Sequence, residues 1–140
     1  MLIPHVVQTE ADKVFINIYN SQVAAIADGT PVAWNVSSPD GVKTTQPVTA
    51  TLSLLCGIVD GTIAASAYGL AQAYGYKASV LVTGDSATTV AAGAILEPVT
   101  GQDRLIYSAA SNGVSGLVMA GEAVATSGAV AAVKCFIRCM

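Results

Sequence analysis

The sequence predicts a mainly β protein: a small β-barrel or β-sandwich with an extended N-terminal arm and at most one or two short helices. Turn residues, above all glycine, recur roughly every 8 to 12 residues in the second half, the spacing of small all-β domains. The apolar runs between them are too short for the helices of a globular domain. The 140 residues suit one domain. We therefore expect an arm over residues 1–12 and a single β-rich domain over 13–140.

The first twelve residues mix apolar and polar side chains without a period, which is typical of an arm that is ordered only where something holds it. No positively charged segment precedes its short apolar patch, and Glu10 and Asp12 follow that patch. This pattern differs from that of a secretory signal, so we expect none here.

Strand character begins at Val14–Tyr19, which is rich in β-branched and aromatic residues and alternates in polarity. After the turn signal at Asp28 comes a second alternating run, Val32–Val36. Residues 42–50 are polar and rich in threonine, so they fit either a long loop or a segment at the edge of a sheet. A further strand is predicted over Thr51–Val59.

Shorter strands are predicted in the second half of the chain, at Ser79–Val82, Ala94–Val99, Arg104–Tyr107, Gly116–Ala120 and Val133–Met140. Two alanine-rich segments, Ser86–Ala92 and Ala129–Val133, are candidate helices because alanine is the best helix former. For the C-terminal segment we favour a strand, with a last helical turn before it as the alternative.

The stretch from Gly61 to Val82 carries a single charge, Lys77, and is long enough to cross a bilayer. Its polar residues argue against a membrane span, and Gly69 and Gly75 divide it into pieces of strand length. We interpret it as the strand-rich centre of the domain. One face of such a strand would carry Leu70, Gln72, Tyr74 and Tyr76, and the other Ala71, Ala73 and Gly75.

The composition indicates a protein that works in an assembly. Charged residues make up 11% of the chain and hydrophobic residues 53%, whereas an ordinary soluble domain has about 25% charged residues. A surface of such low charge does little to oppose association. The basic residues are scattered singly, so we expect no nucleic-acid partner, and we expect no membrane partner either.

Candidate catalytic and metal-binding residues are few. Cys56, Cys135 and Cys139 form neither a disulfide pattern nor a four-ligand zinc set, and we expect buried free thiols. The only histidine, His5, lies in the arm, where a catalytic base would not be held rigidly. The aspartates of the Asp-Gly turns are better explained as turn caps than as calcium ligands. We expect no catalytic residue, no metal and no cofactor.

Several short motifs resemble the capsid decoration, or cement, proteins of tailed bacteriophages, and the similarity covers about residues 14 to 140. These motifs are Asp28–Trp34, Gly57–Ala64, Tyr68–Tyr76, Ala92–Leu96, Gly121–Val124 and Lys134–Arg138. They are patterns of glycine, alanine and short strands rather than catalytic signatures.

The resemblance implies a β-tulip-like or jelly-roll-like domain that binds the outer surface of an assembled phage head as a homotrimer. There it would cement contacts between subunits of the major capsid protein, with no reaction. The protein would be assembled in the host cytoplasm and work on the outside of the virion. Apolar anchors in the arm are expected at Leu2, Ile3, Val6 and Val7, and trimer-interface residues at Tyr74, Tyr76 and Phe136.

Two other functions remain open at the level of the sequence. One is a β-sandwich binding module on a virion or cell surface that recognises glycans through exposed tyrosines or Trp34. The other is a small enzyme that uses Cys56 or one of the aspartates, which would require a thiol of low pKa beside a base.

Overall fold

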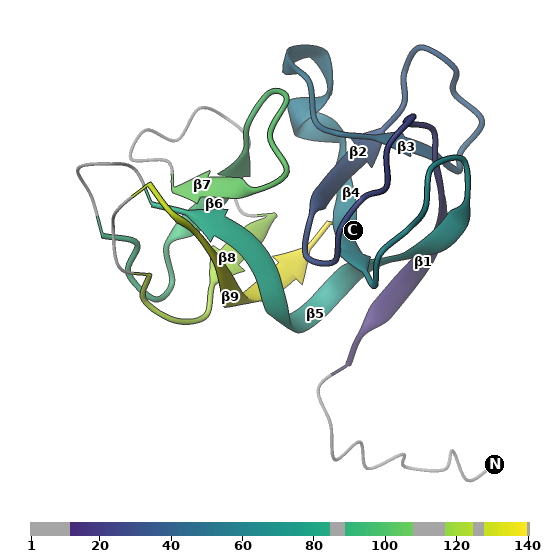
Figure 1. The fold of residues 1–140 in the computed structure, drawn as a ribbon. Coiled ribbons are helices and arrows are strands. Elements are labelled where there is room, and N and C mark those ends of the chain that lie inside the picture. Colours follow the sequence, from purple (N-terminus) through teal and green to yellow (C-terminus); the bar gives the residue numbers. More distant parts are fainter. Residues whose placement is uncertain (1–11, 85–88, 108–116, 125–127, 140) are drawn as a thin grey trace, which may run out of the picture.

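The computed structural model describes residues 12–84, 89–107, 117–124 and 128–139. They form a mainly β structure, which confirms the predicted fold class (Figure 1). The strands are β1 (Val14–Asn20), β2 (Pro31–Trp34), β3 (Lys43–Thr45), β4 (Leu55–Asp60), β5 (Tyr68–Thr83), β6 (Ile95–Pro98), β7 (Leu105–Tyr107), β8 (Val118–Ala120) and β9 (Val130–Arg138). One short 3-10 helix, η1, spans Thr49–Leu54.

The described strands form a single sheet that closes on itself twice. Its order is β1-β3-β2-β4-β5-β7-β6-β8-β9, and β5 also pairs with β1 and with β9. The first ring is therefore β1-β3-β2-β4-β5 and the second is β5-β7-β6-β8-β9. Figure 1 shows the two groups of strands side by side with β5 running from one to the other. Of the two predicted alternatives, the barrel fits this closed pairing better than the sandwich.

The two rings have the same topology, so the fold contains an internal repeat. Adding four to every label in the first ring gives the strand order of the second ring. The pairs β1–β3 and β5–β7 are parallel, and the other pairs in both rings are antiparallel. Strand β5 closes the first ring and opens the second.

The repeat extends to single hydrogen bonds in the turns that lead into β2 and β6. The Gly29 N–H donates to the carbonyl of Val59, at 3.0 Å, and the Gly93 N–H donates to that of Ala120, at 2.7 Å. Both glycines have positive φ, 80° and 84°, which favours glycine at this position. The two turns read Ile26-Ala-Asp-Gly-Thr30 and Val90-Ala-Ala-Gly-Ala94.

Each ring is associated with its own apolar core. The core of the first ring consists of Ile18, Ile26, Val32, Cys56, Val59, Ile63 and Ala71. The core on the side of the second ring consists of Leu55, Ile58, Val80, Val82, Val90, Leu96, Leu105, Val118, Ala120, Val124, Val133, Cys135 and Ile137. Because β4 and β5 contribute to both, the two cores stabilise one continuous sheet.

Strand β5 is continuous, and the predicted division at Gly69 and Gly75 is wrong. Pairing with neighbouring strands holds both glycines in the strand, and Gly75, with φ of 98°, lies where the partner of β5 changes from β1 to β9. Beside it, the Gln72 side-chain amide donates to the carbonyls of Tyr74 and Tyr76, at 3.0 and 3.1 Å. Gly75 thus allows the irregularity that lets one strand serve two rings.

Two other predicted elements need correction. Thr51–Leu54 belongs to η1 rather than to a strand, because the Thr51 hydroxyl accepts a hydrogen bond from the Val48 N–H at 2.9 Å and caps a helical turn. The candidate helix at Ala129–Val133 lies largely in β9, where pairing with β5 overrides the helix propensity of alanine.

Some predicted features lie partly or wholly outside the described residues. The arm, apart from Asp12, and His5 are among them. Of the candidate helix Ser86–Ala92, only residues 89–92 are described, and they contain a β-bridge at Val90 instead of a helix. Within the described ranges, no helix is long and apolar enough to cross a membrane.

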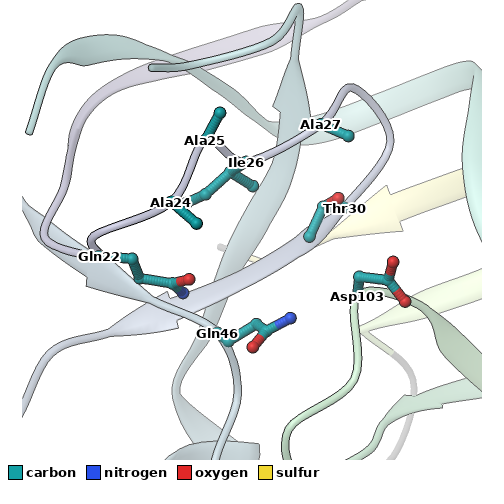
Figure 2. A pocket seen from close by; sticks show the side chains of 8 residues that line it. All are labelled: Gln22, Ala24, Ala25, Ile26, Ala27, Thr30, Gln46 and Asp103. Carbon is teal, nitrogen blue, oxygen red and sulfur yellow. The ribbon is translucent and has the colours of Figure 1, made fainter. Parts of the chain in front are cut away.

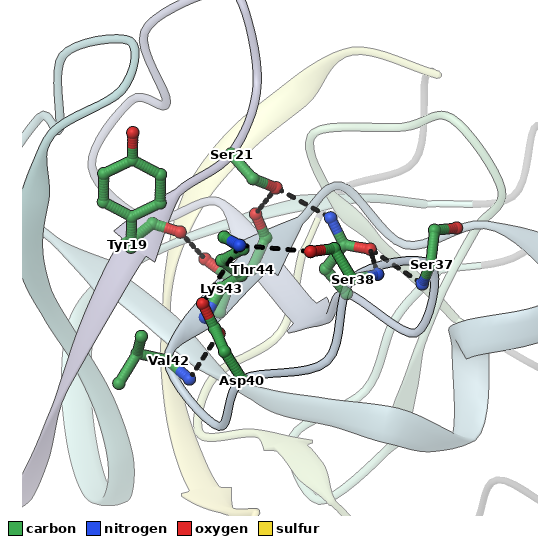
Figure 3. A network of polar contacts seen from close by, with 9 residues as sticks. Tyr19, Ser21, Ser37, Ser38, Asp40, Val42, Lys43 and Thr44 are labelled. Atoms are coloured by element: carbon green, nitrogen blue, oxygen red, sulfur yellow. Dashed lines mark hydrogen bonds and ion pairs between the residues drawn. The ribbon is translucent and has the colours of Figure 1, made fainter.

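A polar network fixes the short strand β3 between β1 and β2, as Figure 3 shows. The Asp40 carboxylate accepts hydrogen bonds from the N–H groups of Val42 and Lys43, at 3.1 and 2.8 Å. The Ser21 hydroxyl donates to the Thr44 carbonyl at 2.7 Å. Asp40 therefore caps its own turn, as predicted for the Asp-Gly sequences.

Candidate functional site

The structure brings together the three residues expected at a trimer interface. Tyr76 and Phe136 are direct partners in the β5–β9 register, and their ring centroids lie 5.0 Å apart in an edge-to-face arrangement. The ring of Tyr74 lies 5.4 Å from that of Phe136. Tyr76 is 44% exposed, whereas Tyr74 and Phe136 are half-buried. The sheet therefore presents an aromatic cluster to its surroundings.

Two neighbours extend this cluster. Val14, which is exposed, lies opposite Tyr74 in the β1–β5 register. The Lys134 ammonium lies 5.6 Å from the centroid of the Tyr76 ring, within reach of a cation–π contact. We call these five residues, Val14, Tyr74, Tyr76, Lys134 and Phe136, the aromatic face.

The chain enters the domain beside this face. A Cβ atom at Gly75 would overlap the carbonyl oxygen of Asp12, so the residue that ends the predicted arm lies against β5 between Tyr74 and Tyr76. The four proposed arm anchors, Leu2, Ile3, Val6 and Val7, lie outside the described residues. The point where the arm joins the domain nevertheless borders the aromatic face.

A second pair of aromatic rings lies at the other end of the β1–β5 pair. The rings of Tyr19 and Tyr68 are 5.0 Å apart, edge to face, and Tyr68 is 65% exposed. Between the two aromatic groups lie Phe15 and Leu70, both exposed. Exposed apolar side chains thus recur along β1 and the first half of β5, with the exposed Asn17 opposite Leu70 between them.

Sequence reasoning missed a buried ion cluster around Lys77, whose side chain is only 6% exposed. Its ammonium lies 2.6 Å from a carboxylate oxygen of Asp60 and 2.9 Å from one of Asp28. Asp28 also accepts hydrogen bonds from the Ser79 hydroxyl, at 2.8 Å, and from the Gly61 N–H, at 2.9 Å. The cluster ties the second half of β5 to the turn before β2 and to the end of β4.

The contacts in this cluster keep both kinds of group charged. Burial raises the pKa of Asp28, but hydrogen bonds from Gly61, Lys77 and Ser79 outweigh it, and the net pKa lies below the ordinary 3.8. Burial lowers the pKa of Lys77, but the hydrogen bonds to Asp60 and Asp28 outweigh it and raise the net pKa above 10.5. Asp28 and Asp60 are therefore partners of a buried cation as well as turn residues.

The aspartates do not gather as calcium ligands would. In the described part of the chain, no group of three or more His, Cys, Asp and Glu residues is placed to hold a metal ion.

The cysteines have the properties expected of buried thiols rather than of nucleophiles. Cys56 and Cys135 are buried and Cys139 is half-buried, and all three are free. Burial is the main cause that raises the pKa of each to about 12. A thiol of such pKa is protonated at neutral pH, and the thiolate is the reactive form. Cys56 therefore does not lie in the environment of a reactive thiol.

Comparisons with known proteins assign no family to this chain. No protein-family model matches it, and none of the curated proteins compared with it matches either. Its function has to be inferred from its own residues and their arrangement.

Proposed function

We propose that this chain is a structural protein of a tailed-phage virion that binds the outer surface of the assembled head as a homotrimer. There it cements contacts between subunits of the major capsid protein. The observation that carries the proposal is the aromatic face, where Tyr74, Tyr76 and Phe136 pack together while Tyr76 stays exposed. The phage head is proposed as the assembly because the sequence motifs resemble those of phage capsid decoration proteins.

The composition of the aromatic face supports contact between protein subunits. Tyrosine and phenylalanine are enriched in interface cores, and edge-to-face packing holds their rings in place before a partner arrives. Ordered rings lose less conformational entropy on binding than flexible side chains do. Two cations border the face: Lys134 lies over the Tyr76 ring, and the exposed Arg138 lies opposite Tyr74 in the β5–β9 register.

The closed sheet supports association through side chains rather than through added strands. Strand β5 belongs to both rings: its pairing with β1 closes the first ring, and its pairing with β9 closes the second. A closed ring offers few free N–H and C=O groups to a strand from another molecule. The exposed apolar side chains of β1, β5 and β9 are therefore the better candidates for contact with a partner.

The position of the arm supports a joint role with this face. Because Asp12 lies against Gly75, an arm that binds the capsid would leave the domain beside the aromatic face. Binding only to the assembled shell stabilises that shell by mass action, and the effect grows with the logarithm of the concentration of the protein.

Pelleting of bare phage heads with the purified full chain tests the proposal. We expect the protein to pellet with the heads at micromolar concentration and to raise their resistance to heat and chelators. The Tyr76→Ser variant should bind more weakly, whereas Val36→Ser, at an exposed site on another segment, should bind as the wild type does. Protein that stays in the supernatant while the heads gain no resistance would overturn the proposal.

One observation favours the alternative of a glycan-binding module. Tyr68 is largely exposed and is held by Tyr19, so its ring could stack on a sugar. Trp34, the other residue considered for this role, packs against the core of the first ring instead. Binding of an oligosaccharide that is lost in Tyr68→Ser, together with no binding to heads, would favour this alternative over the capsid role.

A further inference from the structure

A cavity of about 250 Å³ lies beside the turn that leads into β2 and reaches Asp103 in the loop before β7 of the second ring (Figure 2). Its apolar side is formed by the segment 24–27, including Ile26. Its polar side is formed by Gln22, Thr30, Gln46 and Asp103. The lining shares no residue with the aromatic face, so the role of the cavity is independent of the proposed capsid contact.

Two buried polar atoms in this lining have no hydrogen-bond partner among the residues that the structure describes. They are the Gln22 side-chain nitrogen and the Thr30 hydroxyl oxygen. Thr30 is only 2% exposed, and the Gln22 backbone is fixed by a hydrogen bond from its N–H to the Asn20 side chain at 2.9 Å. Buried polar groups in proteins nearly always have partners. Two such atoms in the lining of one cavity are therefore available to hydrogen-bond a molecule bound there.

The internal repeat shows that the fold does not need the Thr30 hydroxyl. The equivalent residue in the second ring is Ala94. The N–H groups of Thr30 and Ala94 donate to Ala27 and Ala91, and their carbonyls accept from Val59 and Ala120. Because these backbone contacts are the same without a hydroxyl, the Thr30 side chain is free to serve a ligand.

The lining selects the chemistry of the occupant. The Gln22 nitrogen requires an acceptor, the Thr30 hydroxyl can donate or accept, and the Gln46 amide can do both. The one charged lining group is the Asp103 carboxylate, which is half-exposed and already lies 3.3 Å from Arg104. Hydroxyl groups satisfy all of these partners without adding charge. The methyl groups of the segment 24–27 suit the C–H face of a small ring.

We infer that this cavity is a binding site for a small neutral polyhydroxyl compound, of the size of a single sugar ring or cyclitol. Its hydroxyls would accept from Gln22, exchange hydrogen bonds with Thr30 and Gln46, and donate to Asp103. A cavity of this size and polarity gives weak binding, in the millimolar range.

Titration of the isotopically labelled full chain with myo-inositol, D-glucose and sodium acetate, followed by NMR, tests the site. We expect saturable shifts for myo-inositol or glucose at Gln22, Thr30, Gln46 and Asp103, and none for acetate. Thr30→Val should lower the affinity about tenfold, which is the effect of one lost hydrogen bond to a buried group. It should leave the free energy of unfolding unchanged or higher, because no protein partner is lost.

Thr44→Val is the matched control. Thr44 is also buried, but its hydroxyl donates to the Tyr19 carbonyl at 3.2 Å. This variant should be less stable and should bind the polyol as the wild type does. The inference is overturned if none of the probes shifts these resonances, since the cavity then holds water only. It is also overturned if acetate binds in preference to the polyols, or if Thr30→Val binds them unchanged.

Discussion

The rings of Tyr76 and Phe136 lie edge to face across the β5–β9 pair, with 5.0 Å between their centroids and 61° between their planes. This contact joins β5, the strand shared by the two closed rings of strands, to β9, the last strand of the sequence. Since Tyr76 remains exposed, the pair fixes an aromatic surface without filling the core.

Removal of the Tyr76 ring should affect association more than folding. An edge-to-face pair contributes about 0.5 to 1.5 kcal/mol, so Tyr76→Ser should lower the free energy of unfolding by roughly 1 kcal/mol. Self-association should weaken by about tenfold or more if the ring is an interface anchor. Sedimentation equilibrium with Val36→Ser as the control measures this, and equal association of the two variants would exclude Tyr76 from the interface.

A side chain at Gly75 should destabilise the fold strongly. Gly75→Ala places a Cβ on a residue with φ of 98° and against the Asp12 carbonyl. Gly61→Ala is the control, because Gly61 has φ of 79° but open space around it. We expect losses in urea unfolding of about 1 kcal/mol for Gly61→Ala and at least about 2 kcal/mol for Gly75→Ala. Equal losses would mean that the Asp12 contact is unimportant.

Replacement of Lys77 tests the buried ion cluster. Lys77→Met leaves two carboxylates without their cation, but both are partly exposed and can be hydrated. The expected loss of unfolding free energy is about 1 to 2 kcal/mol. Lys43→Met, which breaks the more exposed and solvent-screened pair with Asp40, should lose less than Lys77→Met does. A smaller loss for Lys77→Met than for Lys43→Met would contradict this description of the cluster.

The same cluster predicts the pH dependence of stability. The folded pKa of Asp28 lies below 3.8, so its contribution is present above that value and is lost as the pH falls through the folded pKa. The folded pKa of Lys77 lies above 10.5, so its contribution is lost only as the pH rises beyond that value. Urea unfolding at about pH 7 and about pH 3 should show a smaller decrease for Asp28→Asn than for the wild type. An identical decrease would assign the acid sensitivity to other groups.

The thiols should be inert in the native protein. Because burial raises the pKa of Cys56 and Cys135 to about 12, a disulfide reagent at neutral pH should modify them only as the chain unfolds. The rate of modification should therefore rise with urea in parallel with unfolding. Rapid reaction of Cys56 in the native state would restore the hypothesis of a nucleophilic thiol.

The elements that the sequence predicted well are those in which local pattern and tertiary packing agree. Val14–Tyr19 alternates in polarity and forms β1, and the predicted C-terminal strand forms β9, which buries Val133, Cys135 and Ile137 on one face. The alanine-rich start of β9 was misjudged because alanine carries little strand signal, and pairing with β5 decides its conformation.

Relationships between distant segments could not be predicted in the same way. Asp28, Asp60 and Lys77 lie on separate elements, and only the fold brings them together. The internal repeat left a weak trace in the two turns around Gly29 and Gly93, which share little beyond the glycine and flanking apolar residues. Three residues of the aromatic face, Tyr74, Tyr76 and Phe136, were expected at an interface from the sequence, and that role stays a prediction.

Electron cryomicroscopy of bare phage heads incubated with the full chain tests the central proposal most directly. The account predicts added density at three-fold or quasi-three-fold positions on the outer surface. Into it, three copies of the two-ring fold should fit, with Tyr74, Tyr76 and Phe136 at the contacts between copies. Heads that carry no added density at saturating protein, or copies that meet through surfaces without these residues, would contradict it.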